Sequence, residues 1–146
     1  MGRKLPKVLD REEAEAILSS FHTRYTSQHR NMLALRIMLE TGLRAGEVVA
    51  LRKDHVDLEK CRITVRDGKG ASDRTVWFNG DLREEIAKFL YRDDLAETEY
   101  LLPTRTGNPV DTSQLRKAVS KAVERAGDVV SEPDRVSCHT FRHSYA

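Results

Sequence analysis

The fold is decided by the stretch Thr41-Gly42-Leu43-Arg44-Ala45-Gly46-Glu47 of this 146-residue sequence. Apolar residues precede it at helical intervals, at Met32, Leu35, Met38 and Leu39, and Gly42 is suited to the left-handed residue that often ends a helix. After the stretch, a short helix through Leu51 is expected, with Glu47 in its first turn. Arg44 is therefore predicted to lie between two helices, within reach of Glu47 three residues later.

The rest of the chain predicts mostly further helices. Asp10 and Glu13 have the spacing of a capping box. Helices are expected from Asp10 to about Phe21, from a cap at Asp81 through Leu90, from Thr112 or Ser113 to Gly127, and around His139 to Arg142. The stretches 54–57 and 100–102 are expected to be a connector and a short extended piece.

One β-ribbon is predicted in the middle of the chain. Cys61–Val65 and Arg74–Phe78 alternate and contain β-branched residues, as strands do. The turn Asp67–Gly70 joins them and carries Lys69 at its tip. We expect Trp77 to lie in the core.

This order of elements predicts an α+β fold that is predominantly α-helical, with a small antiparallel ribbon, as a single domain spanning residues 1–146. Hydrophobic residues make up 39% of the chain and charged residues 33%, a balance typical of a globular domain with a polar surface. The sequence lacks the alternating βαβ pattern and the glycine-rich nucleotide fingerprint. A nucleotide-binding enzyme is therefore disfavoured.

The net charge of +2 is only weakly basic, so local clusters must carry any argument for nucleic acid. Two clusters of basic residues could contact a phosphate backbone. One runs from Lys60 to Arg74, with Arg74 itself in the ribbon, and the other comprises Arg116, Lys117 and Lys121 at helical spacing. A solvated face explains either cluster about as well. No segment has the length of a membrane span. Cys61 and Cys138 lack metal-site spacing and are expected to be reduced packing residues. These features predict a cytoplasmic protein.

A second cationic motif, Cys138-His139-Thr140-Phe141-Arg142-His143-Ser144, lies far downstream of Arg44. The planar fork of arginine gives two parallel hydrogen bonds to phosphodiester oxygens, so two arginines can hold one phosphoryl group. A histidine beside them can pass a proton, and a lysine at a ribbon tip can protonate a leaving 5′ oxygen. This chemistry requires no metal or cofactor. His139 and His143 also have the spacing of a metal pair, but no HExxH glutamate accompanies them.

These motifs resemble the catalytic domain of the tyrosine recombinases, the phage integrase family. The family's Thr-Gly-Leu-Arg-x-x-Glu motif is matched at 41–47, and its lysine in a Gly-Lys-Gly turn is matched by Lys69. Its His-x-x-Arg box, followed by His-Ser, is matched at 139–144. The opening at 5–9 is also similar to the usual entry into this domain, so the resemblance covers nearly the whole chain.

The resemblance implies a role for each matched residue. Arg44 and Arg142 would bind the scissile phosphate, and His139 would act as acid/base and phosphate ligand. Lys69 would be the general acid for the leaving oxygen, and Glu47 would orient Arg44. In this family a tyrosine attacks the phosphate and forms a 3′-phosphotyrosyl link. The implied partner is double-stranded DNA, on which the whole enzyme is expected to form a tetramer.

The sequence departs from the family in its nucleophile. The family's tyrosine, and the box before it that carries a second histidine or tryptophan, lie well downstream of His-x-x-Arg. Tyr145 is three residues after Arg142, and Tyr25, Tyr91 and Tyr100 precede it, so none fits. The family's amino-terminal core-binding domain is also not matched. We therefore expect a truncated catalytic domain that binds DNA phosphate but does not cleave alone.

Three alternatives remain open. The chain could be a non-catalytic DNA-binding or regulatory module that retains the phosphate-binding residues. A tyrosine could also be supplied in trans by a neighbouring protomer. A metal-dependent phosphoesterase is weaker, because the sequence has no acidic metal cluster.

Overall fold

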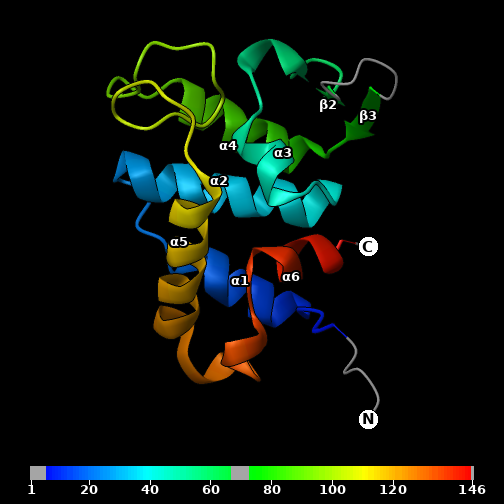
Figure 1. Ribbon diagram of the computed structural model, residues 1–146, viewed down its shortest axis with the longest axis vertical. Coiled ribbons are helices and arrows are strands. Elements are labelled where there is room, and N and C mark those ends of the chain that lie inside the picture. Colours follow the sequence, from blue (N-terminus) through cyan, green and yellow to red (C-terminus); the bar gives the residue numbers. More distant parts are fainter. Residues whose placement is uncertain (1–5, 67–72, 146) are drawn as a thin grey trace.

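The computed structural model describes residues 6–66 and 73–145 and shows a helical body with a small sheet at one edge (Figure 1). Its helices are α1 (Arg11–Ser19), α2 (Thr26–Thr41), α3 (Ala45–Val49), α4 (Gly80–Leu90), α5 (Thr112–Ala126) and α6 (Cys138–His143), with 3₁₀ turns at Lys53–His55, Gly127–Val129 and Pro133–Arg135. The strands β1 (Val56–Asp57), β2 (Arg62–Val65) and β3 (Arg74–Trp77) form an antiparallel sheet in that order. The predicted α-rich α+β class is confirmed.

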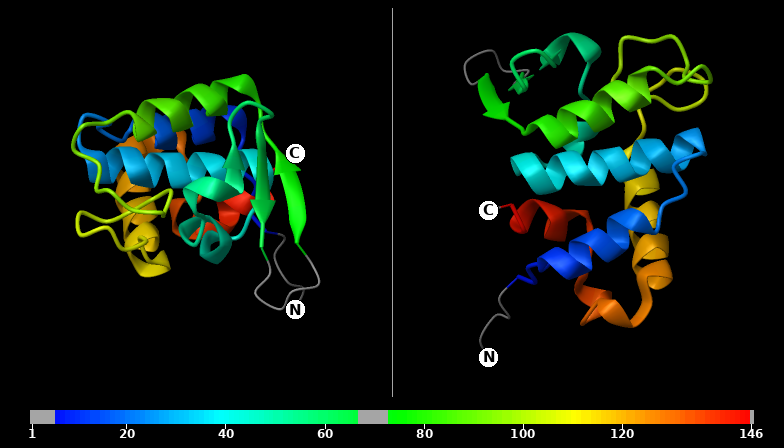
Figure 2. Two further views of the ribbon diagram at one scale, coloured as in Figure 1. Left: turned by 90° about the horizontal axis from the view of Figure 1, so that it is seen from above. Right: turned by 180° about the vertical axis from the view of Figure 1, so that it is seen from behind.

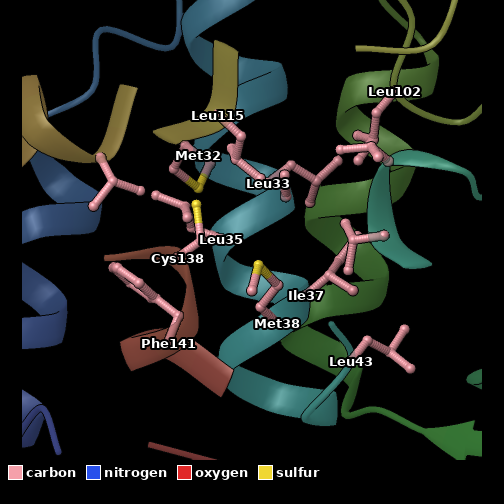
Figure 3. Packing of buried hydrophobic residues seen from close by; sticks show 14 of the residues in the cluster. Met32, Leu33, Leu35, Ile37, Met38, Leu43, Leu102, Leu115, Cys138 and Phe141 are labelled. Atoms are coloured by element: carbon pink, nitrogen blue, oxygen red, sulfur yellow. The ribbon is translucent and has the colours of Figure 1, made fainter. Parts of the chain in front are cut away.

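Helix α2 is the centre of the molecule, and α1, α3, α4 and α6 pack against it (Figure 2). Its residues Leu33, Ala34 and Leu35 are consecutive and all fully buried, a pattern that requires neighbours on every side of a helix. Helix α6 packs against α2, and Figure 3 shows its residue Cys138 beside Met32 of α2 within the buried cluster that also includes Phe141. This packing fixes the helix of the second cationic motif against the helix that leads into the first.

The end of α2 has the predicted geometry. Gly42 has the left-handed backbone conformation, with φ of 73°, and its N–H donates to the carbonyl of Met38 at 2.9 Å. A residue with a Cβ is strained in this conformation. Arg44 then begins α3 with extended backbone. The sharp turn therefore exposes Arg44 immediately beside the carboxyl end of α2.

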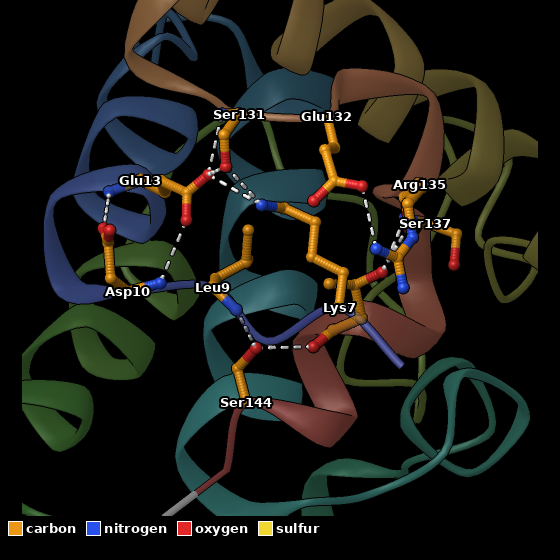
Figure 4. A network of polar contacts seen from close by, with 10 residues as sticks. Lys7, Leu9, Asp10, Glu13, Ser131, Glu132, Arg135, Ser137 and Ser144 are labelled. Carbon is orange, nitrogen blue, oxygen red and sulfur yellow. Dashed lines mark hydrogen bonds and ion pairs between the residues drawn. The ribbon is translucent and has the colours of Figure 1, made fainter. Parts of the chain in front are cut away.

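A polar network ties residues 7–13 to the segments on either side of α6 (Figure 4). The buried carboxylate of Glu13 pairs with Lys7 at 2.9 Å and accepts from the N–H of Ser131 at 2.9 Å. Burial raises the pKa of Glu13, but the bonds from Lys7 and from backbone amides outweigh it, so the net shift is downward. At the other end of α6, the hydroxyl of Ser144 accepts from the N–H of Leu9 at 2.8 Å. The segment that precedes α6 and Ser144, which ends it, are thus both tied to residues 7–13.

Three local predictions were wrong. Trp77 is 64% exposed, because it pairs across the sheet with Arg62 on the outer face while Ile63 and Val65 take the inner face. Asn79, not Asp81, caps α4 and accepts from the N–H of Leu82 at 3.0 Å. The connector at 54–57 contains a 3₁₀ turn and strand β1, which pairs with β2.

No helix in the described ranges is both long enough and apolar enough to cross a membrane.

Candidate active site

The two arginine motifs meet at one cavity. A hollow of about 480 Å³ lies where the end of α2, the start of α3, α5 and α6 converge. Arg44, His139 and Arg142 line it together. Three of the five predicted catalytic residues are therefore neighbours, although two of them are far from the third in sequence.

Arg142 is fixed through its inner nitrogen. The side chain is half-buried, and its Nε donates to the carbonyl of Gly42 at 2.9 Å. A guanidinium has five N–H donors, and no described residue accepts from the two terminal nitrogens of Arg142. The contact with Gly42 thus sets the direction of the side chain and leaves its fork available to an anion.

Arg44 is held through its backbone. Its N–H donates to Oε1 of Glu47 at 2.9 Å, which satisfies an amide that a helix start would otherwise leave unpaired. The side chain is exposed, and its guanidinium has no hydrogen-bond or ion-pair partner among the residues that the structure describes. This cation is free to bind a ligand in the cavity.

Glu47 is occupied by Arg74 as well as by the backbone of Arg44. Arg74 donates to both carboxylate oxygens, at 2.8 and 2.9 Å, and this bond is the largest cause of the lowered pKa of Glu47. Arg74 lies in β3, as expected, and so links the ribbon to α3. Lys69, predicted at the tip of this ribbon, lies outside the described residues.

His139 lies on the exposed side of α6, and its ring packs edge-on against His143 with centroids 4.2 Å apart. Partial burial lowers the pKa of His139, and electrostatic repulsion from His143, Arg142 and Arg44 lowers it further. These surroundings favour the neutral ring. An anion bound between the arginines would offset their charge and raise this pKa.

The three basic residues of α5 that were predicted to contact DNA do not all lie in the cavity. Arg116 lines the cavity, whereas Lys117 and Lys121 are exposed on α5 outside it. Thr112 and Ser137 also line the cavity, although neither was predicted as a site residue. Thr112 was expected only as a possible helix start, and Ser137 precedes α6, a position that hydroxyl residues prefer.

The tyrosines do not reach this cavity. Tyr145 lies against Gly42 and lines a neighbouring hollow of about 460 Å³, which Arg142 and Arg74 also line. Tyr25 precedes α2, Tyr91 follows α4, and Tyr100 bridges to Arg52. No group of three or more histidine, cysteine or acidic side chains in the described ranges is arranged to hold a metal ion.

Comparison with known proteins relates this arrangement to recombinases. Tyrosine recombinase XerA of Thermococcus kodakarensis is 36% identical over 148 residues, covering 99% of this chain and 49% of that protein. Tyrosine recombinase XerC 2 of Ralstonia nicotianae is 33% identical over 156 residues, covering 98% of this chain and 43% of the relative. The chain thus spans about half the length of the curated relatives it matches.

Solved structures agree with the sequence relatives. The crystal structure of XerA recombinase superposes with a TM-score of 0.78 at 25% identity, covering 99% of this chain and 50% of that one. XerH site-specific recombinase, bound to a palindromic difH substrate, also has a TM-score of 0.78, at 28% identity, covering 97% of this chain and 41% of that one. The phage integrase family profile matches residues 7–146. The chain therefore belongs to the phage integrase family of tyrosine recombinases.

Proposed function

We propose that this chain supplies the phosphate-binding part of a site-specific DNA recombinase, which cuts and rejoins double-stranded DNA through a 3′-phosphotyrosyl intermediate. One observation carries the proposal. Arg44, His139 and Arg142 line the same cavity, and described residues leave the outer nitrogens of both arginines without partners. The XerH relative, bound to its difH substrate, supports DNA as the partner.

Each residue has a role that its position supports. Arg44 and Arg142 bind nonbridging oxygens of the scissile phosphate and stabilise the charge that grows as phosphorus becomes pentacoordinate. A preorganised donor of this kind contributes about 3 to 4 kcal/mol to the transition state. His139, neutral when the site is empty, exchanges a proton with the reacting oxygens. Lys69 protonates the leaving 5′ oxygen, and Glu47 holds the backbone of Arg44.

In this proposal, residues 1–146 bind DNA, whereas cleavage requires a tyrosine from elsewhere in the recombinase. The phosphate cavity is lined by none of the four tyrosines among the described residues. Residues 1–146 by themselves bind DNA phosphate without forming a covalent link, and the attacking tyrosine is placed by another part of the recombinase. The whole enzyme acts as a tetramer on DNA, in the cytoplasm at the nucleoid.

Binding is tested by fluorescence anisotropy with a short DNA duplex at several salt concentrations. Arg44→Ala removes one phosphate contact, so the slope of log affinity against log salt should become shallower by about 0.9. Arg83→Ala is the matched control, because Arg83 is exposed on α4 and does not line the cavity. An unchanged slope and affinity for Arg44→Ala would refute the phosphate site.

Cleavage is tested with a nicked substrate that traps a covalent intermediate. The chain should bind this DNA and yield no protein–DNA adduct in a denaturing gel. A covalent adduct would show that a tyrosine within residues 1–146 is the nucleophile, and Tyr145→Phe would then identify whether it is the one beside Arg142.

A further inference from the structure

A second cavity lined by arginines lies at the opposite end of α2 from Arg44. It has a volume of about 380 Å³ and lies among the start of α2 and the segments around residues 94–96 and 103–105. Figures 1 and 2 show the loops between α4 and α5 beside the first turns of α2. Arg24, Arg30 and Arg105 all line this cavity.

Arg30 is a buried cation with no anionic partner among the described residues. It is only 7% exposed, and its Nε donates to the side-chain oxygen of Asn31 at 3.0 Å, while Nη1 lies 3.5 Å from the carbonyl of Pro103. These acceptors are neutral, and no carboxylate in the described part of the chain forms an ion pair with Arg30. Burial consequently lowers its pKa. A buried charge normally requires a counter-charge.

The acidic residue in the cavity wall does not supply that counter-charge. Asp94 accepts from Nε of Arg92 at 3.0 Å and from Nη2 at 3.2 Å, and it also accepts from the hydroxyl of Thr26. The bond from Arg92 is the main cause that lowers the pKa of Asp94 to about 2. Asp94 is thus ionised but already paired, and the wall keeps an excess of positive charge.

The start of α2 adds backbone donors to the same wall. Thr26 and Ser27 line the cavity, and Tyr25, which precedes them, makes no side-chain capping bond. The first amides of a helix lack partners within the helix and point at its positive end. The start of a helix does not by itself indicate an anion site. The start of α2, however, shares a cavity wall with the buried Arg30, which has no carboxylate partner among the described residues.

We propose that this cavity binds a phosphate-class oxyanion. Arg30 holds the anion from inside, Arg24 and Arg105 close over it from exposed positions, and the first amides of α2 complete its hydrogen bonds. The 16 residues of α2 separate this site from Arg44 by about 24 Å, so one phosphate group cannot reach both sites. The proposal does not depend on the phosphate site at Arg44.

The test is a titration of the ¹⁵N-labelled chain with inorganic diphosphate, at an ionic strength kept constant with sodium chloride. The amides of Thr26 and Ser27 should shift and saturate. Replacing both exposed cations, Arg24→Gln with Arg105→Gln, should weaken this binding by about tenfold or more, since each contributes a charge-assisted contact. Absence of saturable shifts at these amides, or equal affinity in the double variant, would overturn the proposal.

Two single variants keep the test specific. Arg83→Gln changes an exposed arginine of α4 that does not line the cavity, so it should leave the affinity within about twofold. Arg44→Gln should remove diphosphate shifts near Ser137 and leave those at Thr26 unchanged. If Arg44→Gln instead abolished the shifts at Thr26, the two cavities would not be separate sites and the proposal would fail.

A DNA duplex distinguishes the two sources of the anion. If the site takes backbone phosphates, the duplex displaces diphosphate from Thr26, and the double variant makes the salt slope shallower by about 1.8. If the site takes a free phosphate ion, the diphosphate shifts persist with DNA bound. Either result supports the site. DNA binding that depends on Arg44, without any diphosphate site, overturns this inference and leaves the proposed function standing.

Discussion

Breaking the pair between Glu47 and Arg74 should loosen the backbone that carries Arg44. Glu47 receives two bonds from the Arg74 side chain, at 2.8 and 2.9 Å, and one from the N–H of Arg44, at 2.9 Å. Arg74→Ala removes the first two, whereas Glu47→Ala removes all three. Glu47→Gln removes the charge but keeps an oxygen for the Arg44 amide.

The loss of unfolding free energy expected for each variant depends on how exposed the Arg74 and Glu47 side chains are. The Arg74 side chain is 47% exposed and that of Glu47 is 23% exposed, so water screens the pair. Exposed ion pairs stabilise by about 0.2 to 1 kcal/mol, and the bidentate geometry favours the upper limit. The bond to the helix-start amide adds about 1 kcal/mol. Arg74→Ala and Glu47→Gln should each cost about 1 kcal/mol, and Glu47→Ala about 2 kcal/mol.

The assay is urea unfolding of the double-mutant cycle between Arg74→Ala and Glu47→Ala. Near pH 7 the coupling energy should be about 1 kcal/mol. Arg74 lowers the pKa of Glu47 below 4.5, so the coupling is complete above that value and disappears as pH falls through the lowered pKa. A coupling energy indistinguishable from zero near pH 7 would refute the reasoning.

The cycle also tests the expectation that Arg74 contacts DNA. If Arg74 acts only through Glu47, then Arg74→Ala in the Glu47→Gln background should leave the salt slope of DNA binding unchanged. A slope shallower by about 0.9 in that background would instead indicate a direct phosphate contact.

Three further predictions concern single sites. Gly42→Ala should cost about 1 to 2 kcal/mol in thermal unfolding, because φ is 73° and the new Cβ would lie 2.9 Å from a tyrosine ring; Gly46→Ala, with no atom within 4 Å and no positive φ, is the control and should not destabilise. His139 should titrate below 6.5 by NMR, and Arg44→Gln should raise its pKa by removing a nearby positive charge; an unchanged pKa would contradict the assigned geometry. Burial lowers the pKa of His29, so unfolding free energy should fall as pH drops below 6.5, and His29→Gln should reduce that dependence.

Local signals account for the features that the sequence predicted correctly. Gly42 ends a helix because it lacks a Cβ, and Asp10 begins one because its side chain accepts from Glu13 N–H at 2.8 Å. The interactions that decide these positions lie within a few residues. The same locality explains why the position of Arg44, immediately after the end of α2, could be predicted.

The features that could not be predicted from the sequence depend on residues far apart in the chain. The pair of Arg74 with Glu47 joins residues 27 apart, and nothing in either segment indicates it. Trp77 lies on the exposed face of β3 and not in the predicted core, because the face that each strand residue takes is set by pairing across the sheet. Strand β1 is two residues long, too short to show alternation. The cavity at Arg30 likewise depends on segments that meet only in the folded chain.

The convergence of Arg44, Arg116 and Arg142 brings like charges together, which opposes folding. The fold offsets this cost without neutralising the ligand-facing nitrogens of Arg44 and Arg142. The Gly42 carbonyl holds Arg142 through Nε, and Glu47 holds Arg44 through the backbone. Repulsion among the cations therefore persists until an anion enters, and relief of that repulsion adds to the affinity for the anion. If the cavity binds phosphate as proposed, it is preorganised for that ligand, because the contacts that hold Arg44 and Arg142 use backbone groups and an inner nitrogen and leave the outer nitrogens of both arginines without described partners.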